Sequence, residues 1–153
     1  MTVPPRSDSF SQLFRMHRLA LHDFYDQLSD HQGDFRAWDG DLSFIGLTDH
    51  LTISSQRLLT QLGNAAPASG TLASTSLTEA RERLASSTEQ VLTDVGHLGP
   101  AALEREVTAF HGARMTVAAL LDIVLAHEAH HKGQVWVMAR LAGIQPPRYL
   151  HFT

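Results

Sequence analysis

The residues best suited to chemistry lie in one stretch near the end of the chain, Leu120 to Ala142, which reads LLDIVLAHEAHHKGQVWVMARLA. His127 and His131 are four residues apart, so on a helix both imidazoles project to one side, which suits joint ligation of a metal ion. The same residues satisfy H-E-x-x-H, a pattern in which Glu128 would be the general base of a zinc protease. Against this, the chain has ten histidines, so such a spacing can arise by chance, and core histidines can be hydrogen-bonded instead.

The neighbours of the two histidines favour a metal. Seven residues recur at steps of four and three along one face of the predicted helix: Leu120, Val124, His127, His131, Gln134, Met138 and Leu141. This face is apolar, then polar, then apolar again. Because burying a polar side chain costs free energy unless a partner satisfies it, the pattern predicts a ligand for the polar part. Gln134, one turn beyond the histidines, could orient a ligand or a bound water.

A histidine on a second predicted helix could complete the site. The helix from about Gly46 to Leu62, closed by Gly63, has an apolar face, and His50 lies on or beside it. Three protein ligands with an open position are typical of catalytic zinc sites. The chain has no cysteine, so nitrogen and oxygen donors must hold any metal.

Composition limits the other classes of function. At 153 residues the chain fits a single domain, covering residues 1–153. The net charge is −4 and Lys132 is the only lysine, which argues against nucleic acid as a partner. No run approaches the ~20 apolar residues that span a bilayer, and the first ten residues lack the apolar core of a signal peptide. We therefore expect a cytoplasmic protein that does not bind membranes.

The remaining periodicity predicts an all-α fold, a four-helix bundle. A loose tail, 1–7, precedes a helix from Ser9 to near Gly33, and a capping box at Ser76 starts a helix to about Gly96. The last helix runs from about Thr116 to Ala142, after a possible short hairpin over 106–116 that turns at His111-Gly112.

Three further residues have two interpretations each. His17 lies on the apolar face of the first helix, where it is either a partly buried, hydrogen-bonded histidine or part of a pocket. Trp38, in the loop 33–45, either anchors that loop or forms the wall of a pocket. His130 points about 100° away from His131 around the helix, which predicts a surface position or an indirect contact with the site.

Two segments resemble the DinB/YfiT-like family of metal-dependent enzymes. They are LTDHLTISSQRLL in the second helix and LAHEAHHKGQVWVMARLAGIQPP in the last, with its H-x-x-x-H-[RK]-G-Q core followed by G-x-x-P-P. The resemblance covers nearly the whole chain and implies a bundle with an up-down-down-up course, often a homodimer. It also implies that His50, His127 and His131 bind a divalent metal, zinc first, with nickel, iron or manganese as alternatives.

The resemblance further implies a class of reaction, because characterised relatives are thiol S-transferases or isomerases that use bacillithiol, mycothiol or glutathione. We therefore expect a transferase, linked to the stress response, that joins a low-molecular-weight thiol to a small electrophilic substrate. Glu128 and Gln134 are the candidate catalytic residues, Glu128 for proton transfer beside a metal-bound water or thiol. Gly133 is expected to permit close approach of another helix beside the site.

Three alternatives remain open. The same metal could activate water, which would make the protein a hydrolase of small esters or amides. The metal could stabilise the bundle without catalysis, or the histidines could be hydrogen-bonded in a metal-free interaction protein. A zinc protease is disfavoured because the chain has no credible sheet to bind a peptide, and the only later histidine is His151.

Overall fold

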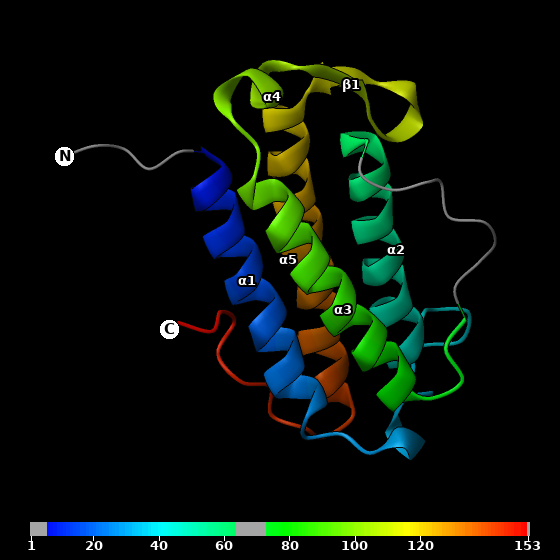
Figure 1. Cartoon of the computed structure of the whole chain (residues 1–153). Coiled ribbons are helices and arrows are strands. Elements are labelled where there is room, and N and C mark those ends of the chain that lie inside the picture. The colour runs from blue at the N-terminus through cyan, green and yellow to red at the C-terminus, as the bar shows by residue number, and fades with distance from the viewer. Residues whose placement is uncertain (1–5, 64–72, 153) are drawn as a thin grey trace.

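The computed structural model describes residues 6–63 and 73–152. Four long helices form a bundle (Figure 1): α1 Arg6–Tyr25, α2 Phe44–Leu62, α3 Leu77–Gly96 and α5 Val117–Leu141. Helices α1 and α5 run in one direction, and α2 and α3 run in the other (Figure 1). The predicted all-α, four-helix bundle with an up-down-down-up course is therefore confirmed. No helix in the described residues is both long and apolar enough to cross a membrane.

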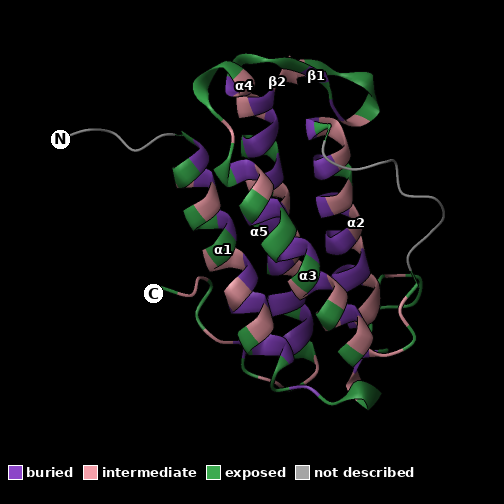
Figure 2. Cartoon of the chain, viewed as in Figure 1, coloured by how far each residue is buried: buried purple, intermediate pink, exposed green. Residues whose placement is uncertain are grey.

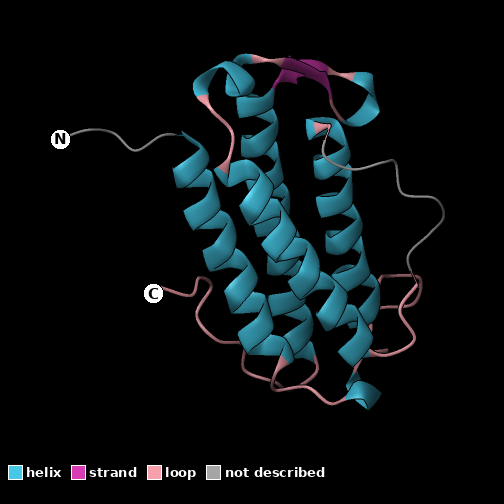
Figure 3. Cartoon of the chain, in the orientation of Figure 1, coloured by secondary structure: helices cyan, strands magenta, loops and turns pink. Residues whose placement is uncertain are grey.

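The predicted hairpin before the last helix is also present, at one end of the bundle (Figure 3). Strands β1 Glu106–Thr108 and β2 Arg114–Thr116 pair antiparallel, around the short helical turn η2 Phe110–Gly112. The turn residues His111 and Gly112 both have positive φ, 58° and 78°, a conformation that glycine adopts without steric cost. A short helix that the sequence analysis did not predict, α4 Pro100–Glu104, precedes the hairpin.

Two boundaries of the first helix differ from the prediction. Helix α1 begins at Arg6, and Ser7 is buried, so residues 6 and 7 of the predicted loose tail are helical. Residues 1–5 of that predicted tail lie outside the described residues. The helix ends at Tyr25 rather than near Gly33, and the short helix η1 Asp30–Gln32 follows. The Asp30 carboxylate accepts hydrogen bonds from the backbone and hydroxyl of Thr78, at 2.8 and 3.0 Å. The segment after Tyr25 therefore contacts the start of α3 instead of continuing the predicted helix.

The other long helices begin at capped residues close to the predicted ones. The side chain of Ser43 accepts from the Gly46 backbone at 3.1 Å, and that of Ser76 accepts from the Glu79 backbone at 3.1 Å. Only half of the predicted capping box forms, because the Glu79 carboxylate accepts from the Thr75 backbone at 2.7 Å. These hydrogen bonds satisfy donors that a helix start leaves free.

Figure 2 shows buried residues along all four long helices. The apolar core consists of two clusters, one that includes hairpin residues and one toward the opposite end of the bundle. A layer of buried polar side chains lies between them, and its centre is Arg18 of α1, which has no exposed surface. The guanidinium donates to both oxygens of Glu128 of α5, at 2.8 and 2.6 Å. It also donates to Thr88 of α3 at 3.1 Å and to Ser55 of α2 at 2.8 Å. One buried cation therefore bonds to all three other helices.

We predict that replacing Arg18 alone destabilises the fold strongly. Arg18→Met leaves the Glu128 carboxylate buried without a cation, which costs roughly 3–5 kcal/mol of unfolding free energy. Urea denaturation followed by circular dichroism measures the loss. The matched double variant, Arg18→Met with Glu128→Leu, removes both charges and should be more stable than Arg18→Met alone. Equal stability of Arg18→Met and the unaltered chain would contradict the inferred role of this pair.

Candidate metal centre

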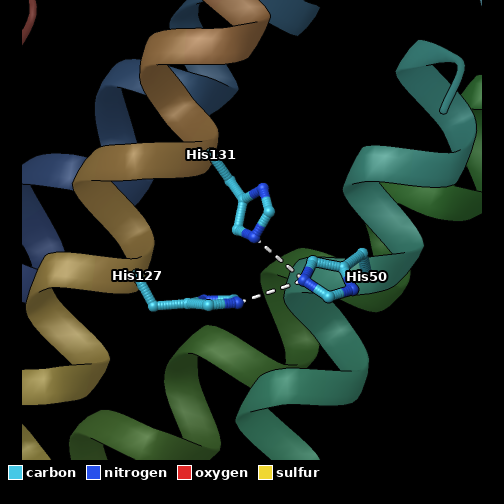
Figure 4. A group of neighbouring side chains, drawn as sticks. All are labelled: His50, His127 and His131. Atoms are coloured by element: carbon cyan, nitrogen blue, oxygen red, sulfur yellow. Dashed lines mark hydrogen bonds between the residues drawn. The ribbon is translucent and has the colours of Figure 1, made fainter. Parts of the chain in front are cut away.

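Three histidines from the two neighbouring helices α2 and α5 point toward one another (Figure 4). His50 comes from the second turn of α2, and His127 and His131 from consecutive turns of α5. The His50 Nε2 atom lies 3.0 Å from Nε2 of His127 and 3.0 Å from Nε2 of His131. All three side chains are half-buried, so the group is reachable from solvent. The structure thus brings together the three residues predicted to bind metal.

The spacing of the three nitrogens fits one metal ion. Two imidazole nitrogens at ~2.1 Å from an ion lie ~3.0–3.4 Å apart when their angle at the ion is between ~90° and ~110°. The two observed separations of 3.0 Å fall at the lower edge of this range. Three imidazoles from two helices leave at least one coordination position without a protein ligand, as in catalytic zinc sites.

Hydrogen bonds alone do not account for this arrangement. A ring nitrogen carries either one hydrogen or one lone pair, whereas Nε2 of His50 meets two other Nε2 atoms at the same distance. His50 cannot form a linear hydrogen bond with both at once. A cation accepts a lone pair from each of the three nitrogens, so the donor set suits a metal better than an internal hydrogen-bond network.

Gln134 holds one of the histidines in the form that a metal requires. Its Oε1 lies 2.6 Å from Nδ1 of His131. A carbonyl oxygen only accepts hydrogen bonds, so Nδ1 is the protonated nitrogen and Nε2 presents its lone pair toward the other two histidines. This agrees with the predicted orienting role of Gln134 and is the contact that commonly supports metal-bound histidines.

The local electrostatics favour the neutral form of the three imidazoles. Burial, followed by the neighbouring His131 and His50, lowers the pKa of His127 to about 4. Burial also lowers the pKa of His50 and of His131, and the hydrogen bond that His131 donates to Gln134 opposes that shift in His131. Because a metal binds only the unprotonated nitrogen, these shifts preserve the ligands at neutral pH.

Glu128, predicted to transfer protons at the metal, lies elsewhere. Its carboxylate is 1% exposed, points into the bundle and accepts hydrogen bonds from Arg18 with both oxygens. It still adds negative potential at the site, since its charge raises the pKa of His50 and of His131. Glu128 was expected beside a metal-bound water or thiol, and its position in the core corrects that expectation. The geometry gives it no direct role in proton transfer at the metal.

The same observation corrects the expected inner face of the last helix. Glu128 and Lys132 are buried, whereas His127 and His131 are half-buried and Leu141 is 60% exposed. Helix α5 is therefore rotated about one residue from the predicted orientation. Arg18 satisfies Glu128, and the Lys132 ammonium donates to the Tyr149 carbonyl, so both charged groups tolerate burial. The histidines come to lie at the rim of the bundle instead of at its centre.

Two residues that the sequence analysis left open lie outside the group. His130 is exposed, with its ring edge-on to that of His131 at 4.8 Å between centroids, in agreement with the predicted surface position. His17 is partly buried on α1, but its Nδ1 has no hydrogen-bond partner among the described residues. His17 was predicted to be either a partly buried, hydrogen-bonded histidine or part of a pocket. The partial burial agrees with the first prediction, but the predicted hydrogen bond is not present at Nδ1 within the described part of the chain.

Arg18 was not predicted as a key residue, although the sequence pattern contained a signal for it. Arg18 follows Phe14 by four residues and precedes Leu21 by three, so it lies on the apolar face of its helix. A charged residue at such a position predicts a buried partner of opposite charge. Glu128 likewise lies on the apolar face of its helix, four residues after Val124. The sequence therefore offered Glu128 as the oppositely charged partner of Arg18.

We predict that Gln134 tightens metal binding through His131. Gln134→Leu removes the acceptor for the Nδ1 proton, and loss of such a contact commonly weakens metal affinity about 10–100-fold. The zinc dissociation constant, measured by competition with a chelating dye, tests this. Gln134→Glu retains an acceptor and should restore most of the affinity. Unchanged affinity in Gln134→Leu would show that the contact is incidental.

We also predict a pH-dependent contribution from His17. Burial, followed by the charge of Lys132, lowers its pKa from 6.5 to about 4. Since the unfolded chain binds the proton more readily, the neutral His17 contributes stability above pH 6.5 that is lost as the pH falls toward 4. In metal-free protein, the difference in unfolding free energy between wild type and His17→Asn should therefore decrease between about pH 7.5 and about pH 5. A constant difference would contradict the lowered pKa.

Comparison with solved structures shows the same fold over almost the whole chain. A DinB-like protein of Bacillus subtilis, YjoA, is 24% identical, with a TM-score of 0.78 over 94% of this chain and 99% of its own. A DinB-like protein of Bacillus cereus ATCC 10987 is 18% identical, with a TM-score of 0.79 over 92% and 95% of the two chains.

A third similar structure is YfiT from Bacillus subtilis, described as a probable metal-dependent hydrolase with an unusual four-helix bundle topology. It is 15% identical, with a TM-score of 0.73 over 94% of this chain and 92% of its own. Comparison with curated proteins gives no match. The model of the DinB superfamily matches residues 13–135, which include all three histidines of the group. The chain therefore belongs to the DinB superfamily, as its resemblance to the DinB/YfiT-like family predicted.

Proposed function

We propose that this protein is a metal-dependent enzyme acting on a small molecule, with a divalent cation held by His50, His127 and His131. The observation that carries the proposal is the convergence of three Nε2 atoms, two pairs of them 3.0 Å apart. The hydrogen bond that His131 Nδ1 donates to the Gln134 carbonyl oxygen supports it, because it selects the tautomer that binds metal. Half-burial of the group supports catalysis over a purely structural role, since structural zinc sites are usually closed.

The chemistry follows from the charge balance of the site. A divalent metal in such a site lowers the pKa of a bound water or thiol, which supplies a nucleophile near neutral pH. Three neutral imidazoles bring no negative charge, and Glu128 is already paired with Arg18. An anionic ligand at the open position is therefore favoured, and hydroxide and thiolate both meet that requirement.

We favour a thiol S-transferase, in which the thiol sulfur forms a bond to an electrophilic carbon of the substrate while a halide leaves or the C–O bond of an epoxide opens. A cavity of about 420 Å³ adjoins the site, and its lining includes His50, Arg36 and Asp34. Arg36 is exposed and donates to the Asp41 carbonyl, and its guanidinium could pair with a carboxylate of a low-molecular-weight thiol. Bacillithiol, mycothiol and glutathione are the candidate co-substrates.

Hydrolysis is the second candidate, favoured by the description of YfiT as a probable metal-dependent hydrolase. Both reactions need the same three histidines and differ in whether water or a thiol provides the nucleophile. The need for added thiol therefore distinguishes them.

The first test is the metal content per chain, measured by plasma mass spectrometry on protein purified without a histidine tag. We predict close to one zinc, nickel, iron or manganese ion per chain in the unaltered protein and a sharp loss in His50→Ala. The matched control is His130→Ala, which removes an exposed histidine next to His131 that lies outside the group. It should retain its metal.

The second test is turnover of small electrophiles, such as epoxides or halogenated carbons, with and without each thiol. Turnover that needs both metal and thiol supports the transferase, and turnover of esters or amides without thiol supports the hydrolase. Metal without turnover, together with a fall in melting temperature on chelation, would point to a non-catalytic metal-stabilised bundle. Absence of metal after reconstitution would overturn the proposal.

A further inference from the structure

A second cavity, of about 320 Å³, lies beside Gln134 of helix α5, the residue that is hydrogen-bonded to His131. Its walls come from the loop 33–43 and from the last turns of α5, and include Trp38, Gly133, Gln134, Val137 and Met138. The volume is at the lower end of the ~300–1,000 Å³ typical of small-molecule pockets. It exceeds the ~150 Å³ cavity that suffices for benzene, so a ring with a substituent fits.

Two large apolar side chains in the lining of this cavity are exposed to solvent. Trp38 is 65% exposed and Val137 is 54% exposed. The neighbouring loop is nevertheless fixed, because the Phe35 ring stacks on Phe44, with 5.6 Å between centroids, and Phe44 is fully buried. Of the three aromatic residues near this loop, Trp38 alone is turned outward to the cavity. Exposed apolar surface around a hollow is characteristic of ligand-binding sites.

Gly133 keeps the cavity open. A Cβ atom added at this position would meet no atom within 4 Å, so the predicted close approach of another helix at Gly133 is wrong. Glycine costs ~1 kcal/mol relative to alanine inside a helix, and no packing constraint in the described residues explains it here. A side chain at this position would instead enter the space beside Gln134 and Val137.

The cavity is joined to the candidate metal centre by a shared residue. Gln134 lines the cavity, and its Oε1 is hydrogen-bonded to Nδ1 of His131 at 2.6 Å. The one ionisable side chain in the lining is that of Asp41, whose Oδ1 accepts from the Leu42 backbone at 2.8 Å. A carboxylate at the edge disfavours an anionic occupant, and the other walls provide few polar partners.

We propose that this cavity binds an apolar, ring-sized part of the substrate whose reacting group reaches the three histidines. The inference rests on the proposed function, and it names the class of substrate: a neutral molecule with an aromatic or alicyclic ring close to its electrophilic or hydrolysable group. Trp38 and Val137 contact the ring, and Gly133 leaves room for it. The cavity beside His50, with Arg36, remains for the charged co-substrate.

The first experiment tests the cavity without metal. Benzyl alcohol is titrated into metal-free protein while the NMR signal of the Trp38 indole N–H is followed. Gly133→Leu fills the cavity and replaces glycine by a better helix former, and Val137→Asp places a charge in its wall at an exposed site. The control, Ile123→Asp, adds the same charge to α5 at a residue that is 40% exposed and outside this cavity.

We expect a saturable shift in wild type and in Ile123→Asp, and at least about fivefold weaker binding in the other two variants. Gly133→Leu occupies the space that the ring needs, and Val137→Asp replaces an apolar contact by a charge. No saturable shift in wild type would overturn the inference, and so would equal binding in all four proteins. A wild-type dimer that dissociates in Val137→Asp, without benzyl alcohol binding, would also overturn it. The apolar surface would then belong to the predicted homodimer interface.

The second experiment links the cavity to the metal. Imidazole and 4-phenylimidazole are compared by calorimetry on metal-loaded protein, since both present the same nitrogen to the ion. We expect 4-phenylimidazole to bind at least about tenfold more tightly in wild type, and the two to bind about equally in Gly133→Leu.

The outcomes separate this inference from the proposed function. If imidazole binds but the phenyl group gives no advantage, the metal centre stands and the inference fails. If the protein takes up no metal, the proposed function fails, and so does the assignment of the ring to a substrate of that centre. Binding of benzyl alcohol would then identify an apolar site independent of metal.

Discussion

The buried contact between Arg18 and Glu128 is the constraint on which the rest of the structure depends. Each long helix passes from one apolar cluster to the other at a polar residue that belongs to this layer. The transitions are Phe14-Arg18-Leu21, Leu51-Ser55-Leu58, Leu84-Thr88-Val91 and Val124-Glu128-Val135. A buried ion pair tolerates little displacement, since a misplaced partner leaves a charge without compensation in a medium of low dielectric constant. The layer therefore fixes the height and the rotation of all four helices relative to one another.

The rotation of α5 determines what kind of site the histidines can form. With Glu128 turned inward, the neighbouring His127 points about 100° away, toward α2 and the rim of the bundle. His131 follows one turn later on the same side, and His50 approaches both from α2. Had the histidines occupied the inner face, a bound ion would have been enclosed by the core. The buried carboxylate of Glu128 thus places the three histidines where small molecules can reach them.

The sequence predicted the type of fold, the hairpin and the three histidines, because helical periodicity and histidine spacing are local properties of the chain. It did not predict the rotation of α5. Two faces of this helix fit the helical periodicity equally well, one with the histidines and Gln134 and one with Glu128 and Lys132. The contact with Arg18, which is 110 residues away from Glu128 in sequence, decides which of the two faces is buried. The end of α1 was missed for a similar reason, because the contact from Asp30 to Thr78 joins distant segments. Boundaries and helix rotations depend on such partners, and local pattern does not contain them.

Stability and chemistry are therefore separated along one helix. Residues such as Val124, Glu128 and Val135 are buried in the bundle, whereas the histidines are half-buried and Val137 is exposed to solvent. Substitutions of the half-buried and exposed residues of α5 leave the buried contacts between the helices largely unchanged. The lining of the site can therefore vary while the polar layer keeps its geometry. Gly133 fits this division, because it weakens the helix slightly and opens a cavity beside the site. That combination is expected where a scaffold with a fixed core accommodates different small molecules at its rim.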